Sequence, residues 1–227
     1  MMSKFRITLY FDFVSPYSWL ALSQAESFAE RHGIVWELRP VVYAALLDAR
    51  GLVGPAEVEA KRRYTFHDVA RCAEELELEF VGPPEHPFRS IEALRTVCLF
   101  DSNPRAAVLA AALAHACWSE GRSLTDLGVL TEVVTDVGLD ATGLDERIGE
   151  PVVKGRLRGN TEQALEDGVF GVPTFVHQHE IFWGHDRMRH LAADLEGTAR
   201  TSEFARRAEE MLSRPRGVDR KRAPERG

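Results

Sequence analysis

The sequence contains little cysteine, and this scarcity excludes several classes of protein. It has only Cys72, Cys98 and Cys117, far apart along the chain, and no Cys-x-x-Cys pair. An odd number of widely spaced cysteines does not form the disulfide framework of a small secreted protein, and it provides neither a zinc site nor a redox dithiol. Because all three lie among apolar residues in segments with helical spacing, we expect buried, unreactive thiols.

Long apolar runs and an excess of basic charge are also absent. No stretch approaches the roughly 18 consecutive apolar residues of a membrane span, and the N-terminus leads into a strand-like segment rather than a signal peptide. We therefore expect a cytoplasmic protein with no membrane partner. The formal net charge is −7. An acidic body does not attract nucleic acid, and the short basic tail at 214–227 is expected to be a disordered end without a function.

The chain has 227 residues, 44% of them apolar, which is enough for a sizeable core. Its beginning predicts a strand, a helix and a second strand. Residues 5–13 (FRITLYFDF) alternate like a half-buried strand. Ser15 and Pro16 suit the N-cap and first position of a helix that Gly33 can end, and residues 34–38 form the next strand. Such a unit places two parallel strands side by side through a right-handed crossover.

The middle of the chain predicts helices, and the end returns to strands. One predicted helix, 104–120, would begin at Asn103-Pro104 and end at Gly121. Two short strand-like runs at 174–178 and 180–183 are close enough to form a hairpin. The sequence therefore predicts an α/β fold in which one sheet is built from both ends of the chain around a helical insertion. The expected helices of this scheme cover residues 56–78, 90–102, 104–120, 124–137, 151–167 and 187–195.

The segment GVFGVP at 168–173 precedes the first of these late strands. Proline cannot donate to a strand ladder and is tolerated only at the first residue of a strand or at an edge, so we expect an exposed edge here. A cis Val172-Pro173 bond would leave the Val172 N–H and C=O facing outward, able to pair with an extended peptide. An ordinary trans proline in a loop is the alternative, and the pattern does not decide between them.

Three segments together resemble a known family. FDFVSPYSWLA at 11–21, GVFGVPTF at 168–175 and FWGHDRM at 182–188 follow the order and spacing of the 2-hydroxychromene-2-carboxylate isomerases. These isomerases belong with the kappa-class glutathione transferases in the DsbA-like branch of the thioredoxin superfamily. The resemblance implies a thioredoxin-like fold (βαβ followed by ββα) and a homodimer. Its implied parts are a discontinuous thioredoxin-like domain at 1–42 and 168–213, and a helical insertion domain at 43–167.

The resemblance also implies a site for glutathione. In the family, a serine at this strand-to-helix turn replaces the nucleophilic cysteine of disulfide oxidoreductases, and the matching residue is Ser15. A hydroxyl there can donate a hydrogen bond to a thiolate, which the helix dipole also favours. By the same match, Val172 would pair through its main chain with the cysteinyl part of glutathione, Pro173 would be cis, and His185 and Asp186 would bind the γ-glutamyl end. Simple helix capping is the alternative for Ser15 and Asp186.

The helical insertion carries Lys61-Arg62-Arg63-Tyr64, which resembles a stretch beside the thiol and substrate in these isomerases. We assign a catalytic role to Lys61 and substrate binding to Tyr64, and leave Arg62 and Arg63 open; a solvated helix face is the alternative. Two segments depart from the family pattern. Gly51-Leu52-Val53-Gly54-Pro55 lacks the usual asparagine, and His86-Pro87-Phe88-Arg89-Ser90 replaces an asparagine-containing segment, which makes Arg89 a candidate substrate contact.

These features predict a glutathione-dependent isomerase that acts by reversible addition of a thiolate to an unsaturated aromatic carboxylate. The cofactor would be glutathione or another low-molecular-weight thiol, and no metal is expected. Two alternatives stay open: a kappa-like glutathione transferase, and a non-catalytic thioredoxin-like protein that binds a peptide or protein partner. A disulfide oxidoreductase is excluded by the lack of a cysteine at residue 15.

Overall fold

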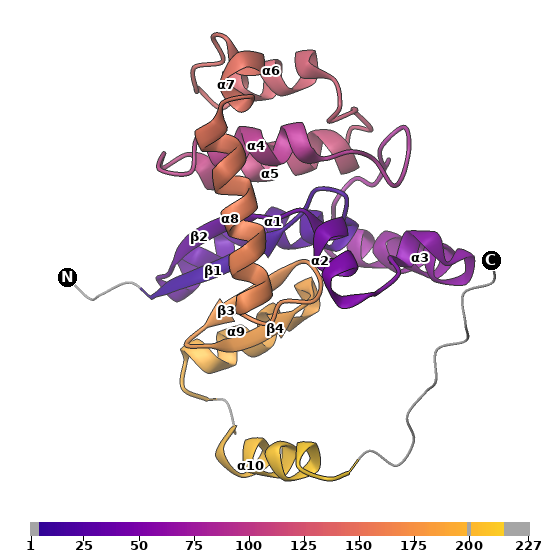
Figure 1. The fold of residues 1–227 in the computed structure, drawn as a ribbon, viewed down its shortest axis with the longest axis vertical. Coiled ribbons are helices and arrows are strands. Elements are labelled where there is room, and N and C mark those ends of the chain that lie inside the picture. The colour runs from indigo at the N-terminus through magenta and orange to yellow at the C-terminus, as the bar shows by residue number, and fades with distance from the viewer. Residues whose placement is uncertain (1–4, 199–200, 216–227) are drawn as a thin grey trace. The chain divides into compact units, whose positions relative to one another are not determined.

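A computed structural model describes residues 5–198 and 201–215. Within these residues, the strands form a four-stranded sheet in the order β2-β1-β3-β4 (Figure 1). The two parallel strands come from the N-terminal part of the chain, and the antiparallel hairpin comes from the C-terminal part. The prediction of one sheet built from both ends of the chain is confirmed. The strands are β1 (Arg6–Phe11), β2 (Val35–Pro40), β3 (Thr174–His177) and β4 (Glu180–Trp183).

The first unit has the predicted strand–helix–strand form. Helix α1 (Pro16–His32) has Ser15 as its N-cap and proline at its first position. It ends at Gly33, whose φ of 63° lies in the left-handed region that glycine adopts without strain. The strands β1 and β2 pair in parallel from Arg6 opposite Val35 onward, as a right-handed crossover through α1 requires.

Helices occupy the chain between β2 and β3. Helices α4, α5 and α8 contact β2, while α5 also packs against α1. Figure 1 shows α4 to α7 gathered beyond the sheet and α8 running back toward it. The elements are α2 (Tyr43–Arg50), the 3-10 turn η1 (Pro55–Glu57), α3 (Glu59–Glu75), α4 (Ile91–Leu99), α5 (Ala106–Trp118), α6 (Leu127–Asp136), α7 (Leu144–Ile148) and α8 (Pro151–Glu166).

Several details of this helical region differ from the prediction. Helix α2 was not predicted, and α3 begins at Glu59, three residues after the start of the expected helix 56–78. Helix α5 starts at Ala106 with Arg105 as its N-cap, so Asn103-Pro104 does not begin it. The Asn103 side chain instead accepts a hydrogen bond of 2.9 Å from the Arg105 N–H, which makes an Asx turn ahead of the helix. Helix α7 was not predicted, because five residues are too few to show helical periodicity.

The predicted strand edge at Pro173 is also wrong. Strand β3 lies between β1 and β4, and the edges of the sheet are β2 and β4. Pro173 stands just before β3, and its peptide bond with Val172 is cis, as the resemblance implied. A proline ahead of the first strand residue removes no donor from the ladder, so an interior strand tolerates it. Its carbonyl accepts a 2.9 Å hydrogen bond from the Gly184 N–H at the end of the hairpin.

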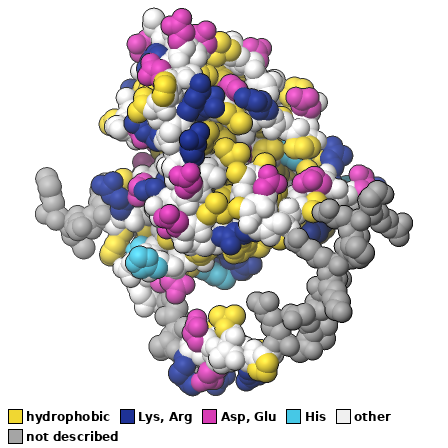
Figure 2. All heavy atoms as spheres, in the orientation of Figure 1, with side chains coloured by type: hydrophobic (Ala, Val, Ile, Leu, Met, Phe, Trp, Pro, Cys, Tyr) yellow, Lys and Arg dark blue, Asp and Glu magenta, His cyan; other side chains and the backbone are white. Residues whose placement is uncertain are grey.

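The C-terminal elements are the 3-10 turn η2 (His185–Arg187), α9 (Met188–Leu195) and α10 (Thr201–Leu212). The described residues up to Ala192 form one compact unit, and those from Ala193 onward form another. Most of the predicted basic tail, from residue 216 onward, lies outside the described residues. On the face seen in Figure 2, acidic and basic side chains are interspersed. Among the helices that the structure describes, none is long and apolar enough to cross a membrane.

All three cysteines are free thiols. Cys98 and Cys117 are buried, and burial raises the pKa of each to about 12, so these two are unreactive as predicted. Cys72 is only half-buried, so the expectation of burial is wrong for this thiol.

Candidate functional site

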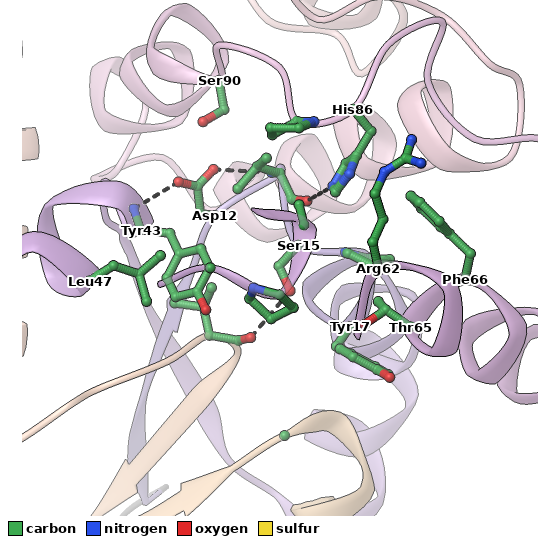
Figure 3. A pocket seen from close by; sticks show the side chains of 18 of the residues that line it. Asp12, Ser15, Tyr17, Tyr43, Leu47, Arg62, Thr65, Phe66, His86 and Ser90 are labelled. Carbon is green, nitrogen blue, oxygen red and sulfur yellow. Dashed lines mark hydrogen bonds between the residues drawn. The ribbon is translucent and has the colours of Figure 1, made fainter. Parts of the chain in front are cut away.

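A cavity of about 850 Å³ opens where β1 runs into α1 (Figure 3). Sites for small molecules in proteins span roughly 300–1,000 Å³, so this volume suits a tripeptide-sized ligand together with a small substrate. Its walls come from the β1–α1 turn, the starts of α2 and α4, one face of α3 and the turn after β4. The lining residues used below are Asp12, Ser15, Tyr17, Arg62, Tyr64, Asp68, Cys72, His86, Arg89, Val172, His185, Asp186 and Arg187.

Ser15 lies at the base of this cavity and caps α1. Its hydroxyl oxygen accepts a hydrogen bond of 3.4 Å from the Ser18 N–H and donates one of 3.2 Å to the Val172 carbonyl. The side chain is thus the helix cap that its sequence context suggested. Both bonds are long for their type, and only one of them uses the hydroxyl proton. An anion in the cavity can therefore accept the hydrogen bond of the Ser15 hydroxyl in place of the Val172 carbonyl.

Val172 belongs to the loop before β3 and is 6% exposed. Its carbonyl accepts from Ser15, while its N–H donates to no group in the described part of the chain. A buried backbone N–H without a partner is uncommon and favours a ligand that supplies an acceptor. Ser15 and Val172, which were both expected to bind glutathione, are therefore in contact, although Pro173 itself does not line the cavity.

Asp12 lies in the cavity wall near Ser15, and no role was predicted for it. It is 2% exposed, and its carboxylate accepts hydrogen bonds from the N–H groups of Val14 at 3.1 Å and Tyr43 at 2.9 Å. Burial raises the pKa of Asp12, whereas the Ser90 hydroxyl and the two N–H donors oppose that rise. The carboxylate thereby ties the β1–α1 turn to the first residue of α2 and to the residue before α4.

A network of aromatic and acidic side chains forms the wall between α1 and α3. Asp68 accepts hydrogen bonds from the hydroxyls of Tyr17 at 2.8 Å and Tyr64 at 3.2 Å. The His185 ring stacks on Tyr17 with a centroid distance of 5.7 Å. Burial raises the pKa of Tyr17 and lowers that of His185. Tyr64 and His185 both line the cavity, and one face of the His185 ring lies against Tyr17.

Asp186 stands at the rim, in the turn η2. Its carboxylate forms an ion pair of 3.1 Å with Arg187, and both side chains are substantially exposed. Gly184 has a φ of 104°, and a Cβ there would lie 2.6 Å from an Asp186 oxygen. Only glycine therefore permits this turn to present the carboxylate as it does.

The predicted cationic residues lie in different places. Lys61 is exposed on α3 and does not line the cavity, whereas its neighbour Arg62 does. The Arg62 guanidinium lies 5.3 Å from the centre of the Phe66 ring. Arg89 lines the cavity as predicted, but its guanidinium donates to the Glu92 carboxylate at 2.9 to 3.1 Å. That bidentate pair already satisfies the charge of Arg89.

His86 is a further cavity residue for which no role was predicted. Its Nε2 lies 2.9 Å from the Val14 carbonyl, so Nε2 carries the hydrogen and donates it to the turn beside Ser15. Burial lowers the pKa of His86, and the nearby charge of Arg62 acts in the same direction. His86 is therefore a neutral side chain that holds the turn in place.

Cys72 also lines the cavity, one helical turn after Asp68 on α3. Burial, followed by the charges of Asp68 and Glu75, raises its pKa. The thiol consequently stays protonated at neutral pH and is a poor nucleophile.

The chain is similar to known proteins over most of its length. Residues 6–196 match the family of DsbA-like thioredoxin domains. The 2-hydroxychromene-2-carboxylate isomerase of Sphingobium xenophagum is 34% identical over 83% of this chain and 97% of its own length. Human glutathione S-transferase kappa 1 is 27% identical over 82% of this chain and 88% of its own.

Solved structures show the same fold. A 2-hydroxychromene-2-carboxylate isomerase superposes with a TM-score of 0.79 at 24% identity, covering 91% of this chain and 98% of the other. The cytosolic disulfide reductase DsbM of Pseudomonas aeruginosa, in its structure with GSH, superposes with a TM-score of 0.58 at 19% identity, covering 84% and 99%.

Proposed function

We propose that this chain, which belongs to the DsbA-like thioredoxin family, is a glutathione-dependent isomerase of the 2-hydroxychromene-2-carboxylate isomerase type. The observation that carries the proposal is the hydroxyl of Ser15. It stands at the N-terminus of α1, in the wall of the cavity and in hydrogen-bond contact with Val172. This turn is the place where a thioredoxin-like fold would carry a reactive cysteine, so the thiol must come from a bound molecule.

The residues in the cavity fit glutathione. Its cysteinyl backbone offers an acceptor for the unpartnered Val172 N–H. Its γ-glutamyl ammonium suits Asp186 at the rim, in place of the exposed pair with Arg187. Its thiol would lie against Ser15. A relative named for glutathione transfer, and a fold neighbour solved with GSH, support the same cofactor.

Bound glutathione would supply a thiolate that adds reversibly to a conjugated carbon of an unsaturated aromatic carboxylate, so that the former double bond can rotate before it re-forms. Ser15 would turn its hydroxyl proton from the Val172 carbonyl toward the sulfur. The N-terminal end of α1 also favours a negative charge at this point. Both effects lower the thiol pKa and raise the fraction of nucleophile at neutral pH.

The remaining members of the site would hold this arrangement still. His86 fixes the carbonyl of Val14, and Asp12 fixes the N–H of the same residue, so the turn before Ser15 is held from two sides. A hydroxyl cannot form a mixed disulfide, and the protonated Cys72 belongs to α3 rather than to this turn. Disulfide exchange is therefore not part of the proposal.

A kappa-like glutathione transferase is the second candidate, because human kappa 1 transferase is 27% identical over most of the chain. It would bind the thiol of glutathione at the same place, beside Ser15, and release the glutathione conjugate as its product. A binding protein without activity is less well supported, since the exposed strand edge that suggested it is absent: β3 is an interior strand. We further propose a cytoplasmic homodimer that acts in aromatic catabolism.

The experiment that tests the proposal follows the ultraviolet absorbance of 2-hydroxychromene-2-carboxylate in the presence of enzyme and glutathione. An isomerase brings the substrate to equilibrium with its isomer while glutathione, present far below the substrate concentration, is not consumed. A transferase instead consumes one glutathione per turnover. If calorimetry shows that glutathione does not bind and no conversion occurs, both enzymatic proposals are wrong.

A further inference from the structure

Three arginine side chains line the cavity, and they differ in what balances their charge. Arg89 is paired with Glu92, and Arg187 is paired with Asp186. Arg62 has no carboxylate within ion-pair distance among the residues that the structure describes, and its side chain donates no hydrogen bond to any of them. Of the guanidinium groups in this wall, Arg62 is the one whose charge is left for a ligand.

The surroundings of Arg62 hold its side chain in position but leave its charge and its hydrogen-bond donors without a partner among the described residues. The side chain is half-buried, and its guanidinium lies 5.3 Å from the centre of the Phe66 ring. Contact with an aromatic face orients a guanidinium and leaves its edge donors unused. Arg62 is also the fourth residue of α3, near the positive end of the helix dipole, where a cation is disfavoured. The positive charge of Arg62 is therefore stabilised neither by the helix dipole nor by a carboxylate among the described residues.

Arg62 lies in the same part of the cavity wall as Ser15, the proposed binding residue for the thiolate. Its charge lowers the pKa of His86, which in turn bonds the Val14 carbonyl next to Ser15. Figure 3 shows the Arg62 guanidinium beside the His86 ring, on the side of the cavity that α3 and the His86 segment form. An anionic group bound by Arg62 would therefore lie in the cavity next to the turn that carries Ser15.

We propose that Arg62 binds the carboxylate of the unsaturated acid and thereby selects acids over their neutral esters. This inference rests on the proposed function and names the residue that sets its substrate class. A planar guanidinium can donate two parallel hydrogen bonds to a carboxylate, which recovers the cost of its partial burial. The role first assigned to Lys61, which is exposed outside the cavity, passes to Arg62. The glycyl end of glutathione is a second carboxylate that Arg62 could meet, and the test must separate the two.

The test compares Arg62→Gln and Arg62→Lys with the control Arg63→Gln, an exposed neighbour on α3 that does not line this cavity. Calorimetry measures the binding of chromone-2-carboxylate, a stable analogue, of its ethyl ester, and of glutathione. We expect Arg62→Gln to weaken binding of the acid by roughly 10- to 100-fold, as for loss of a charged hydrogen-bond partner. Binding of the ester and of glutathione should not change, Arg62→Lys should restore part of the affinity, and kcat/KM for 2-hydroxychromene-2-carboxylate should fall with acid binding.

Two results would overturn the inference. Equal losses for acid and ester would mean that Arg62 only shapes the cavity. Weaker glutathione binding with unchanged acid binding would assign Arg62 to the glycyl carboxylate. Failure of the proposed function looks different: the wild-type protein would then neither bind glutathione nor convert the substrate, while the effect of Arg62→Gln on the analogue could still be measured.

Discussion

The hydroxyl of Ser15 donates its proton to the carbonyl of Val172 across 3.2 Å, although the two residues are 157 positions apart in the chain. This bond joins the N-cap of α1 to the loop before β3. The hydroxyl that is proposed to bind a thiolate therefore lies next to the main-chain group that is proposed to bind a peptide. The Val172 N–H is left without a partner in the described part of the chain. A bound thiolate would therefore compete with the Val172 carbonyl for the hydrogen bond that the Ser15 hydroxyl donates.

The buried carboxylate of Asp12 should be a main support of this turn. Substituting Asp12→Asn replaces one acceptor oxygen by an amide NH₂, which then faces an N–H that already donates, either that of Val14 or that of Tyr43. We expect the free energy of unfolding to fall by about 1–3 kcal/mol in urea titrations. The control is Asp48→Asn, an exposed position on α2, which should change stability by less than about 0.5 kcal/mol. Equal effects at both positions would show that Asp12 does not hold the turn.

Stability should fall in mildly acidic solution because of His185. Its folded-state pKa lies below the ordinary value of 6.5 because of burial, so the unfolded chain binds its proton first. The stabilising contribution is complete above that ordinary value and is lost as the pH falls below it toward the folded-state pKa. Urea titrations at several pH values should show a smaller acid-side loss for His185→Phe, which keeps an aromatic ring against Tyr17. An unchanged pH slope in this variant would contradict the assignment.

The rate at which Cys72 is chemically modified should show whether a ligand occupies the cavity. Because Cys98 and Cys117 are buried, a thiol reagent such as DTNB should modify one thiol per native chain, and Cys72→Ser should abolish that reaction. Since Cys72 lines the cavity, S-methylglutathione, which has no free thiol, should slow the modification. Modification that is insensitive to S-methylglutathione would mean that the tripeptide does not reach this side of α3.

Local signals made the core of the fold predictable from the sequence. The β1–α1–β2 unit is set by an alternating strand, by Ser15 and Pro16 at a helix start, and by Gly33 at its end. Each of these acts within a few residues, so no tertiary information is needed. The position of β3 could not be predicted in this way, because a proline before a strand is compatible with an edge and with an interior strand alike.

The composition of the cavity wall was harder to predict. Lys61 and Arg62 are adjacent, and about 100° of rotation around α3 separates them, so the choice between them depends on how that helix packs. Asp12 and His86 act through contacts with Tyr43 and with Val14, which only the folded chain brings within reach. Ser15 could be found because a resemblance over three segments marked it. The stretch Lys61-Arg62-Arg63-Tyr64 also showed a resemblance, but it did not single out Arg62.

The most direct test of the account is the ionisation of bound glutathione. The ultraviolet absorbance of the thiolate, titrated against pH, gives the thiol pKa in complexes with the wild type, with Ser15→Ala and with the control Ser18→Ala. Ser18 is a buried serine of the same helical turn that does not line the cavity and whose hydroxyl has no partner in the described structure. We expect a thiol pKa below that of free glutathione in the wild type and in Ser18→Ala, and a higher value in Ser15→Ala. A bound thiol that ionises at the same pH as free glutathione, or equally in all three proteins, would contradict it.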